Sequence, residues 1–213
     1  ELARRMVAVG RETGTRVVAF LTRMDEPLGR MVGNACEIEE SVDVLSGRGP
    51  ADVIELTEVL GGAMVELAKG VSFDEGRARI AASLRDGSAL DRWSRMVREH
   101  GGDASRLPRH GGEVAVVSTR AGVVQSIDGR EVGLVAVQLG AGRARREDPV
   151  DPAVGIRIDR KVGERVELGA PLATILTGAG GAPTGVLMAR LGAAFVVGDE
   201  PVGQRPIILE RVG

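Results

Sequence analysis

The chain changes character at one place, the segment GGDASRLPRHGGE at residues 101–113. Before it, apolar residues recur at helical spacing over long stretches. After it, short runs rich in β-branched residues alternate with glycines, as in strands joined by turns. A charged segment rich in glycine and proline between two such regions is typical of a domain boundary. We therefore expect two domains, residues 1–110 and residues 111–213.

The first region has the pattern of an α/β layer fold. RVVAFLT at residues 16–22 is a short, continuously apolar run, which predicts a buried strand of a parallel sheet. A helix precedes this strand, and a loop and further helices follow it. Helical spacing is found at residues 1–13, 34–47, 50–70, 72–87 and 88–102. We expect these residues to be the remainder of a large α/β domain with a parallel sheet.

The second region predicts a strand-rich C-terminal module of α/β hammerhead-like type. Its strands are expected in EVAVVSTRAGVVQSID and VGIRIDRKVGERVELGAPLATIL, which are punctuated by glycine. Residues 129–142 space their apolar side chains as one short helix, and residues 205–212 predict a closing strand. The whole chain is thus expected to be of the α/β (α+β) class.

Composition excludes some partners. The formal charge is −2, from 28 basic and 30 acidic residues, and aromatic residues make up 2%, so neither a phosphate backbone nor stacked bases would be bound. No apolar run approaches the ~20 residues that span a bilayer. We expect no nucleic acid and no membrane as partner. Cys36 is the only cysteine, which fits a reducing cytoplasm. The chain starts at Glu1 inside a helical pattern, and we expect it to be a piece of a longer protein.

The stretch EPLGRMVGNACEIEES at residues 26–41 leads from a loop into an acidic helix. It lacks lysine, serine or threonine where a bound phosphate would need them. One interpretation is a loop-to-helix junction in which Asn34 caps the helix and glutamates complement its dipole. The other is a cation site, in which loop carbonyls and a carboxylate supply the hard oxygen ligands that potassium, calcium or magnesium prefer. The residues alone leave both open.

The stretch VGERVELGAPLATI at residues 162–175 is similar to the hairpin of biotinyl and lipoyl carrier domains. In a carrier, a lysine at an exposed hairpin tip bears the cofactor. Lys161 lacks the flanking methionines of such a site, so the likeness indicates hairpin architecture. A carrier domain and a non-catalytic binding or structural module remain alternatives to an enzyme.

Two long stretches resemble signature regions of thymidine phosphorylase and the pyrimidine-nucleoside phosphorylases: TRMDEPLGRMVGNACEIEESVDVLSGRGPADVIELT and LGAGRARREDPVDPAVGIRIDRKVGERVELGAPLATI. The resemblance implies phosphorolysis, in which phosphate attacks a pyrimidine nucleoside and releases the free base and a (deoxy)ribose 1-phosphate. It implies a homodimeric enzyme without an organic cofactor. The family's catalytic, phosphate and base residues lie in an N-terminal half that this chain lacks. No catalytic residue is therefore expected here, and the isolated chain should be inactive.

The resemblance also implies a structural potassium ion. Its ligands at matching positions are the main-chain carbonyls of Leu28 and Met31 and the carboxylate of Glu40. The remaining ligands belong to the absent phosphate loop, so the isolated chain should bind potassium weakly or not at all. The turn at Met6 and Val7 resembles a segment that lines the apolar side of the pyrimidine pocket.

Overall fold

The structure is a computed structural model that describes residues 1–178, 180–203 and 205–213. It divides into two compact units. The first holds residues 1–23, 44–92 and 205–213, and the second holds residues 24–43 and the chain between residues 93 and 204. The division runs through helices α2 (Ala35–Leu45) and α5 (Ser88–Glu99). This division differs from the domain boundary near residue 110 that the sequence predicts. The assignment of residues 1–110 and 111–213 to two domains stays a prediction.

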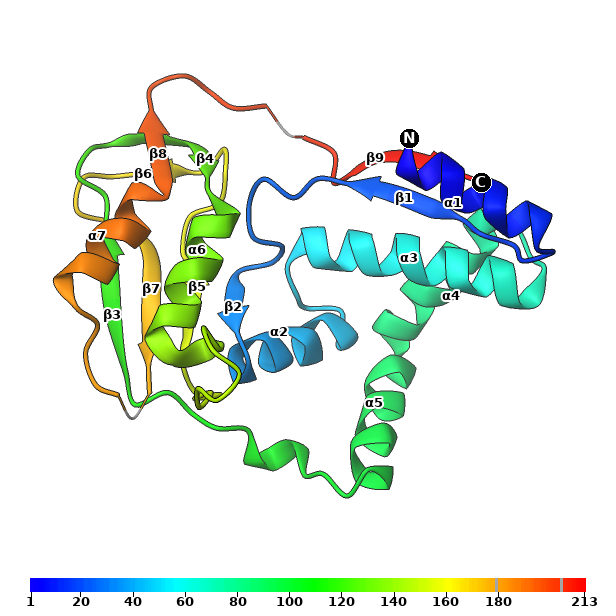
Figure 1. Ribbon diagram of the computed structural model, residues 1–213, viewed down its shortest axis with the longest axis horizontal. Coiled ribbons are helices and arrows are strands. Elements are labelled where there is room, and N and C mark those ends of the chain that lie inside the picture. The colour runs from blue at the N-terminus through cyan, green and yellow to red at the C-terminus, as the bar shows by residue number, and fades with distance from the viewer. Residues whose placement is uncertain (179, 204) are drawn as a thin grey trace. The chain divides into compact units, whose positions relative to one another are not determined.

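The first unit combines helices with a two-stranded sheet (Figure 1). Its elements are α1 (Leu2–Glu12), β1 (Ala19–Thr22), α3 (Ala51–Lys69), α4 (Phe73–Asp86) and β9 (Ile208–Val212). The predicted helices are all confirmed. Ser72 caps α4, its Oγ accepting a hydrogen bond from the Glu75 amide at 3.2 Å, and glycines with positive φ follow α3 and α4.

The predicted parallel sheet is wrong. Strand β1 pairs antiparallel with β9, and every strand pair in the described part of the chain is antiparallel. A parallel partner would require a crossover connection, and among the described residues β1 pairs with β9 alone. β1 is also not buried on both faces. The Phe20 ring packs against Phe73 at 6.1 Å between centroids, but Leu21 is 37% exposed.

The second unit contains two antiparallel sheets, in the orders β2-β5-β7-β3 and β6-β4-β8. Its strands are β2 (Met31–Gly33), β3 (Gly112–Val117), β4 (Gly122–Ile127), β5 (Gly155–Ile158), β6 (Arg165–Val166), β7 (Pro171–Thr177) and β8 (Phe195–Gly198). Helices α6 (Gly129–Ala136) and α7 (Gly185–Ala193) pack on these strands, and short turns η1 (Ala104–Arg106) and η2 (Val137–Ala141) complete the unit. The predicted strands and the short helix at α6 are confirmed, but the closing strand predicted at residues 205–212 is β9, which belongs to the first unit and pairs with β1.

One hydrophobic core holds the second unit together. Its most deeply buried side chains are Val124, Ile127, Val132, Val135, Ile156, Ile158, Ile175 and Leu191. Strand β7 is buried along its middle five residues, because β5 and β3 flank it and α7 packs on it. Burial of this kind stabilises the unit by about 25 cal/mol per Å² of apolar surface. None of the described helices is long and apolar enough to cross a membrane.

Candidate functional site

The loop before strand β2 is held by helix α2, which follows the strand. Gly29 is buried in this loop at a φ of 65°, a conformation that glycine adopts without strain. The carboxylate of Glu40, on α2, turns back to the loop. Its Oε1 accepts a hydrogen bond from the Arg30 amide at 2.8 Å and its Oε2 one from the Met31 amide at 3.5 Å. These bonds fix Glu40 beside the start of β2.

The Met31 carbonyl lies on the outer edge of the four-stranded sheet. Strand β2 ends the order β2-β5-β7-β3, so only one side of it is paired. The Arg30 carbonyl accepts from the Ile158 amide at 2.7 Å, and Met31 with Arg157 is therefore a non-hydrogen-bonded pair of the ladder. The amide and carbonyl of Met31 both point away from β5, toward the side on which the amide meets Glu40.

Leu28 supplies the other predicted carbonyl. Its side chain is exposed, and among the described residues no hydrogen bond reaches its carbonyl oxygen. The described residues also contain no group of three or more His, Cys, Asp or Glu suited to a metal, so a cation site here depends on main-chain oxygens. Two carbonyls and the Glu40 carboxylate fit a hard cation. That Leu28, Met31 and Glu40 bind potassium stays a prediction.

The start of helix α2 is tied down by distant backbone. The Ala35 amide donates to the Pro152 carbonyl at 3.0 Å. The side chain of Asn34 donates through Nδ2 to the Ala141 carbonyl at 2.7 Å, a bond that the predicted role of helix cap did not include. The position of Glu40 thus depends on segments that come more than a hundred residues later in the chain.

Lys161 is a residue of this site that sequence reasoning missed. Its ammonium donates to the carbonyls of Pro27 and Gly29, the latter at 3.1 Å, and lies 3.5 Å from Oε2 of Glu26. The side chains of Lys161 and Glu26 are only 15% and 10% exposed. A carbonyl group has no side-chain signature, so nothing in the sequence marks Pro27 and Gly29 as partners of a lysine.

The turn between β5 and β6 makes further contacts with the same loop. Arg30 forms an ion pair with Glu164 at 2.5 Å and also donates to the carbonyls of Ile158 and Asp159, each at 3.2 Å. We call Lys161, Glu164 and the turn that carries them, residues 159–164, the clasp. Because the Lys161 ammonium is engaged by the loop, it is not displayed at a hairpin tip as a carrier lysine must be.

Cys36 is buried near the start of α2, and its environment does not favour a nucleophilic thiol. An added Cβ at Gly33 or Gly155 would come within 2.9 Å or 2.6 Å of its sulfur, which shows how closely the backbone packs on it. Burial raises the pKa of the Cys36 thiol, and the nearby Glu37 carboxylate raises this pKa further. The thiol therefore stays protonated and unreactive at neutral pH.

Met6 and Val7 lie on different faces of α1. Met6 is 55% exposed, whereas Val7 is 7% exposed and lines a hollow of about 440 Å³ in the first unit together with Arg11, Glu66 and Arg211. Arg211 forms an ion pair with Glu66 at 2.7 Å. The expectation that Met6 and Val7 line a pyrimidine pocket stays a prediction.

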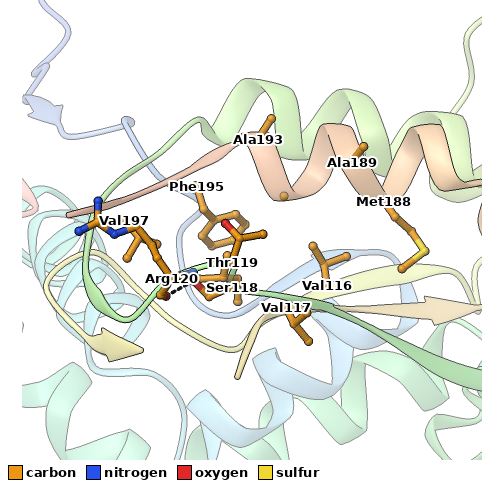
Figure 2. A pocket seen from close by; sticks show the side chains of 12 residues that line it. Val116, Val117, Ser118, Thr119, Arg120, Met188, Ala189, Ala193, Phe195 and Val197 are labelled. Carbon is orange, nitrogen blue, oxygen red and sulfur yellow. Dashed lines mark hydrogen bonds between the residues drawn. The ribbon is translucent and has the colours of Figure 1, made fainter. Parts of the chain in front are cut away.

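A second hollow, also of about 440 Å³, lies between α7 and β3 (Figure 2). Its walls are apolar side chains of Val116, Met188 and Phe195. Two of its polar side chains are engaged within the protein: the Ser118 hydroxyl donates to the Arg120 carbonyl at 2.6 Å, and the Arg120 guanidinium pairs with Asp199 at 2.7 Å.

Comparison with known proteins bears on both units. A family model for the pyrimidine nucleoside phosphorylase C-terminal domain matches residues 123–183. The chain is 44% identical over 215 residues to a thymidine phosphorylase of Mycobacterium tuberculosis (strain ATCC 25618 / H37Rv), which covers 100% of this chain and 48% of the relative. It is 42% identical over 182 residues to a pyrimidine-nucleoside phosphorylase of Bacillus subtilis (strain 168), which covers 82% of this chain and 42% of the relative. The chain spans about half the length of the curated relatives it matches.

Proposed function

Because the chain belongs to the thymidine and pyrimidine-nucleoside phosphorylase family, as its C-terminal portion, we propose that it is part of a pentosyltransferase that cleaves pyrimidine nucleosides with phosphate. In this reaction a phosphate oxygen forms a bond to the anomeric carbon, and the bond from that carbon to the base nitrogen breaks. The products are the free base and a (deoxy)ribose 1-phosphate. The observation that carries the proposal is the 44% identity along the whole chain to a thymidine phosphorylase.

Within that enzyme this chain would have a supporting role. Its own loop before β2 presents main-chain oxygens and Glu40 at a sheet edge and offers no lysine or hydroxyl side chain to a phosphate. The residues that bind phosphate and base would then lie elsewhere in the enzyme. We propose a homodimer as the active assembly, on the strength of the resemblance alone.

A potassium ion held by the carbonyls of Leu28 and Met31 and by Glu40 is the cofactor we propose. The support is geometric: the Met31 amide and carbonyl face the same side of β2, and that amide already contacts Glu40. A monovalent cation there would neutralise the carboxylate and cross-link the loop to α2. It would thereby stabilise whichever neighbouring segment shares the ion.

The proposal predicts phosphate-dependent release of base by the full-length enzyme that carries this sequence. Thymidine and uridine are incubated with and without phosphate, and the free base is quantified by chromatography. Thymine or uracil should appear only with phosphate, and the isolated 213-residue chain should release neither. Absence of release from both nucleosides by the full-length protein would refute the proposal.

A further inference from the structure

Lys161 places a fixed positive charge inside the loop for which we propose a potassium ion. The ammonium contacts the carbonyls of Pro27 and Gly29 and the carboxylate of Glu26, and its side chain is 15% exposed. A buried charge is tolerated only where it is paired and hydrogen-bonded, and here both conditions are met. The Val162 amide also donates to Glu26, at 3.3 Å, so the carboxylate is fixed from two directions.

Contacts with Lys161 and with β5 divide the carbonyls of residues 27–31 into two groups. Those of Pro27 and Gly29 accept from the Lys161 ammonium, and that of Arg30 accepts from β5. Between Pro27 and Met31, the carbonyls that accept no hydrogen bond from the described residues are those of Leu28 and Met31. They are the carbonyls that the proposed ion site requires.

We propose that Lys161 is a positioning residue, whose ammonium holds the Pro27 and Gly29 carbonyls and thereby leaves those of Leu28 and Met31 directed at an exchangeable cation beside Glu40. This inference rests on the proposed function. The loop then has two cation positions with different occupants: a lysine ammonium that is covalently attached and always present, and a mobile ion. The tethered charge orders the loop in advance, so the ion binds without ordering it.

The substitution Lys161→Met tests the first half of this inference on the 213-residue chain itself. It keeps most of the aliphatic stem and removes the donor. Hydrogen exchange at the Arg30 and Met31 amides, which are bonded to Glu40, should become roughly 10- to 100-fold faster. Lys69→Met is the matched control, since Lys69 is exposed at the end of α3. Unchanged hydrogen exchange at these two amides in Lys161→Met would overturn the inference, independently of the activity of the full-length enzyme.

The second half is tested in the full-length enzyme by titration with potassium chloride. For Lys161→Met, the potassium concentration that gives half of the maximal rise in Tm should increase about tenfold or more. The half-saturating potassium concentration for kcat should increase equally, with kcat at saturating potassium little changed. A merely structural lysine would lower Tm at every potassium concentration without moving the midpoint, and that result would overturn the inference.

Removal of Lys161 leaves the Glu26 carboxylate without its charge partner, which is a separate source of destabilisation. The double variant Glu26→Gln/Lys161→Met removes both charges and keeps an acceptor for the Val162 amide. It should still show fast loop exchange and the raised potassium midpoint, because the two carbonyls remain without their donor. Recovery of wild-type values in the double variant would overturn the inference. If the wild-type enzyme itself shows no response to potassium, the proposed ion fails, whereas the exchange test stands.

Discussion

At Cys36, close packing of backbone around a single sulfur atom controls how the residue responds to pH. Gly33 and Gly155 carry no Cβ, and this absence gives the sulfur its space. The same enclosure that keeps the thiol from reacting also raises its pKa, with Glu37 acting in the same direction. A group whose pKa is higher in the folded protein than in the unfolded chain holds its proton more tightly when folded. Its contribution to stability is therefore complete below the unfolded pKa and is lost as pH rises above it.

We expect the free energy of unfolding to fall for this reason above a pH of about 8.5, the ordinary pKa of a cysteine. Urea titrations of the wild-type chain and of Cys36→Ala at about pH 7 and about pH 9.5 measure the effect. The cavity left by alanine lowers the free energy of unfolding by the same amount at both pH values. The difference in the free energy of unfolding between wild type and Cys36→Ala should therefore shrink at the higher pH. An advantage that is constant or grows with pH would show that the thiol pKa is not raised.

At the scale of elements, two glycines allow α3 and α4 to cross closely. A Cβ added at Gly76 would lie 2.3 Å from the Gly62 carbonyl oxygen, and one at Gly62 would lie 2.6 Å from the Arg77 side chain. Both glycines are buried. Glycine in the interior of a helix weakens that helix, so the close approach of the two helix backbones offsets the lower helical propensity.

Gly76→Ala should destabilise the first unit by about 1–3 kcal/mol, because backbone must move to admit the methyl group. Gly133→Ala is the counterpart: this residue is also inside a helix, α6, but an added Cβ would meet nothing within 4 Å. That substitution should stabilise the protein by about 0.5–1 kcal/mol through helical propensity. Chemical denaturation of both variants provides the measurement. Equal effects of the two substitutions would contradict the packing described for α3 and α4.

The elements differ in how far sequence alone could predict them. Helices such as α4 were predictable because Ser72, Glu75 and the following glycine mark their ends locally. Whether β1 pairs parallel or antiparallel was not predictable. Its partner β9 comes from the other end of the chain, and an apolar run does not indicate the direction of the neighbouring strand. Glu40 was predicted as an ion ligand through a sequence resemblance, and that role stays a prediction. Lys161 was missed, because its partners are carbonyl groups.

Across the whole molecule, the proposed ion site draws on one loop and one helix of this chain. Two carbonyls and one carboxylate are fewer oxygen donors than a hard cation takes. We expect potassium and sodium chloride at equal ionic strength to give the isolated chain the same Tm. The full-length enzyme should be more stable in potassium. Differential scanning fluorimetry compares the two proteins directly, and selective stabilisation of the isolated chain by potassium would contradict this expectation.

Strand β9 pairs with β1, although nearly the whole chain separates them. During synthesis, a ribosome adding ~5–20 residues per second takes roughly ten seconds or more to pass from one strand to the other. Through that interval β1 cannot pair with β9, while the residues of the second unit are being made. Pairing of β1 with β9 therefore completes the first unit only after the residues of the second unit have been made.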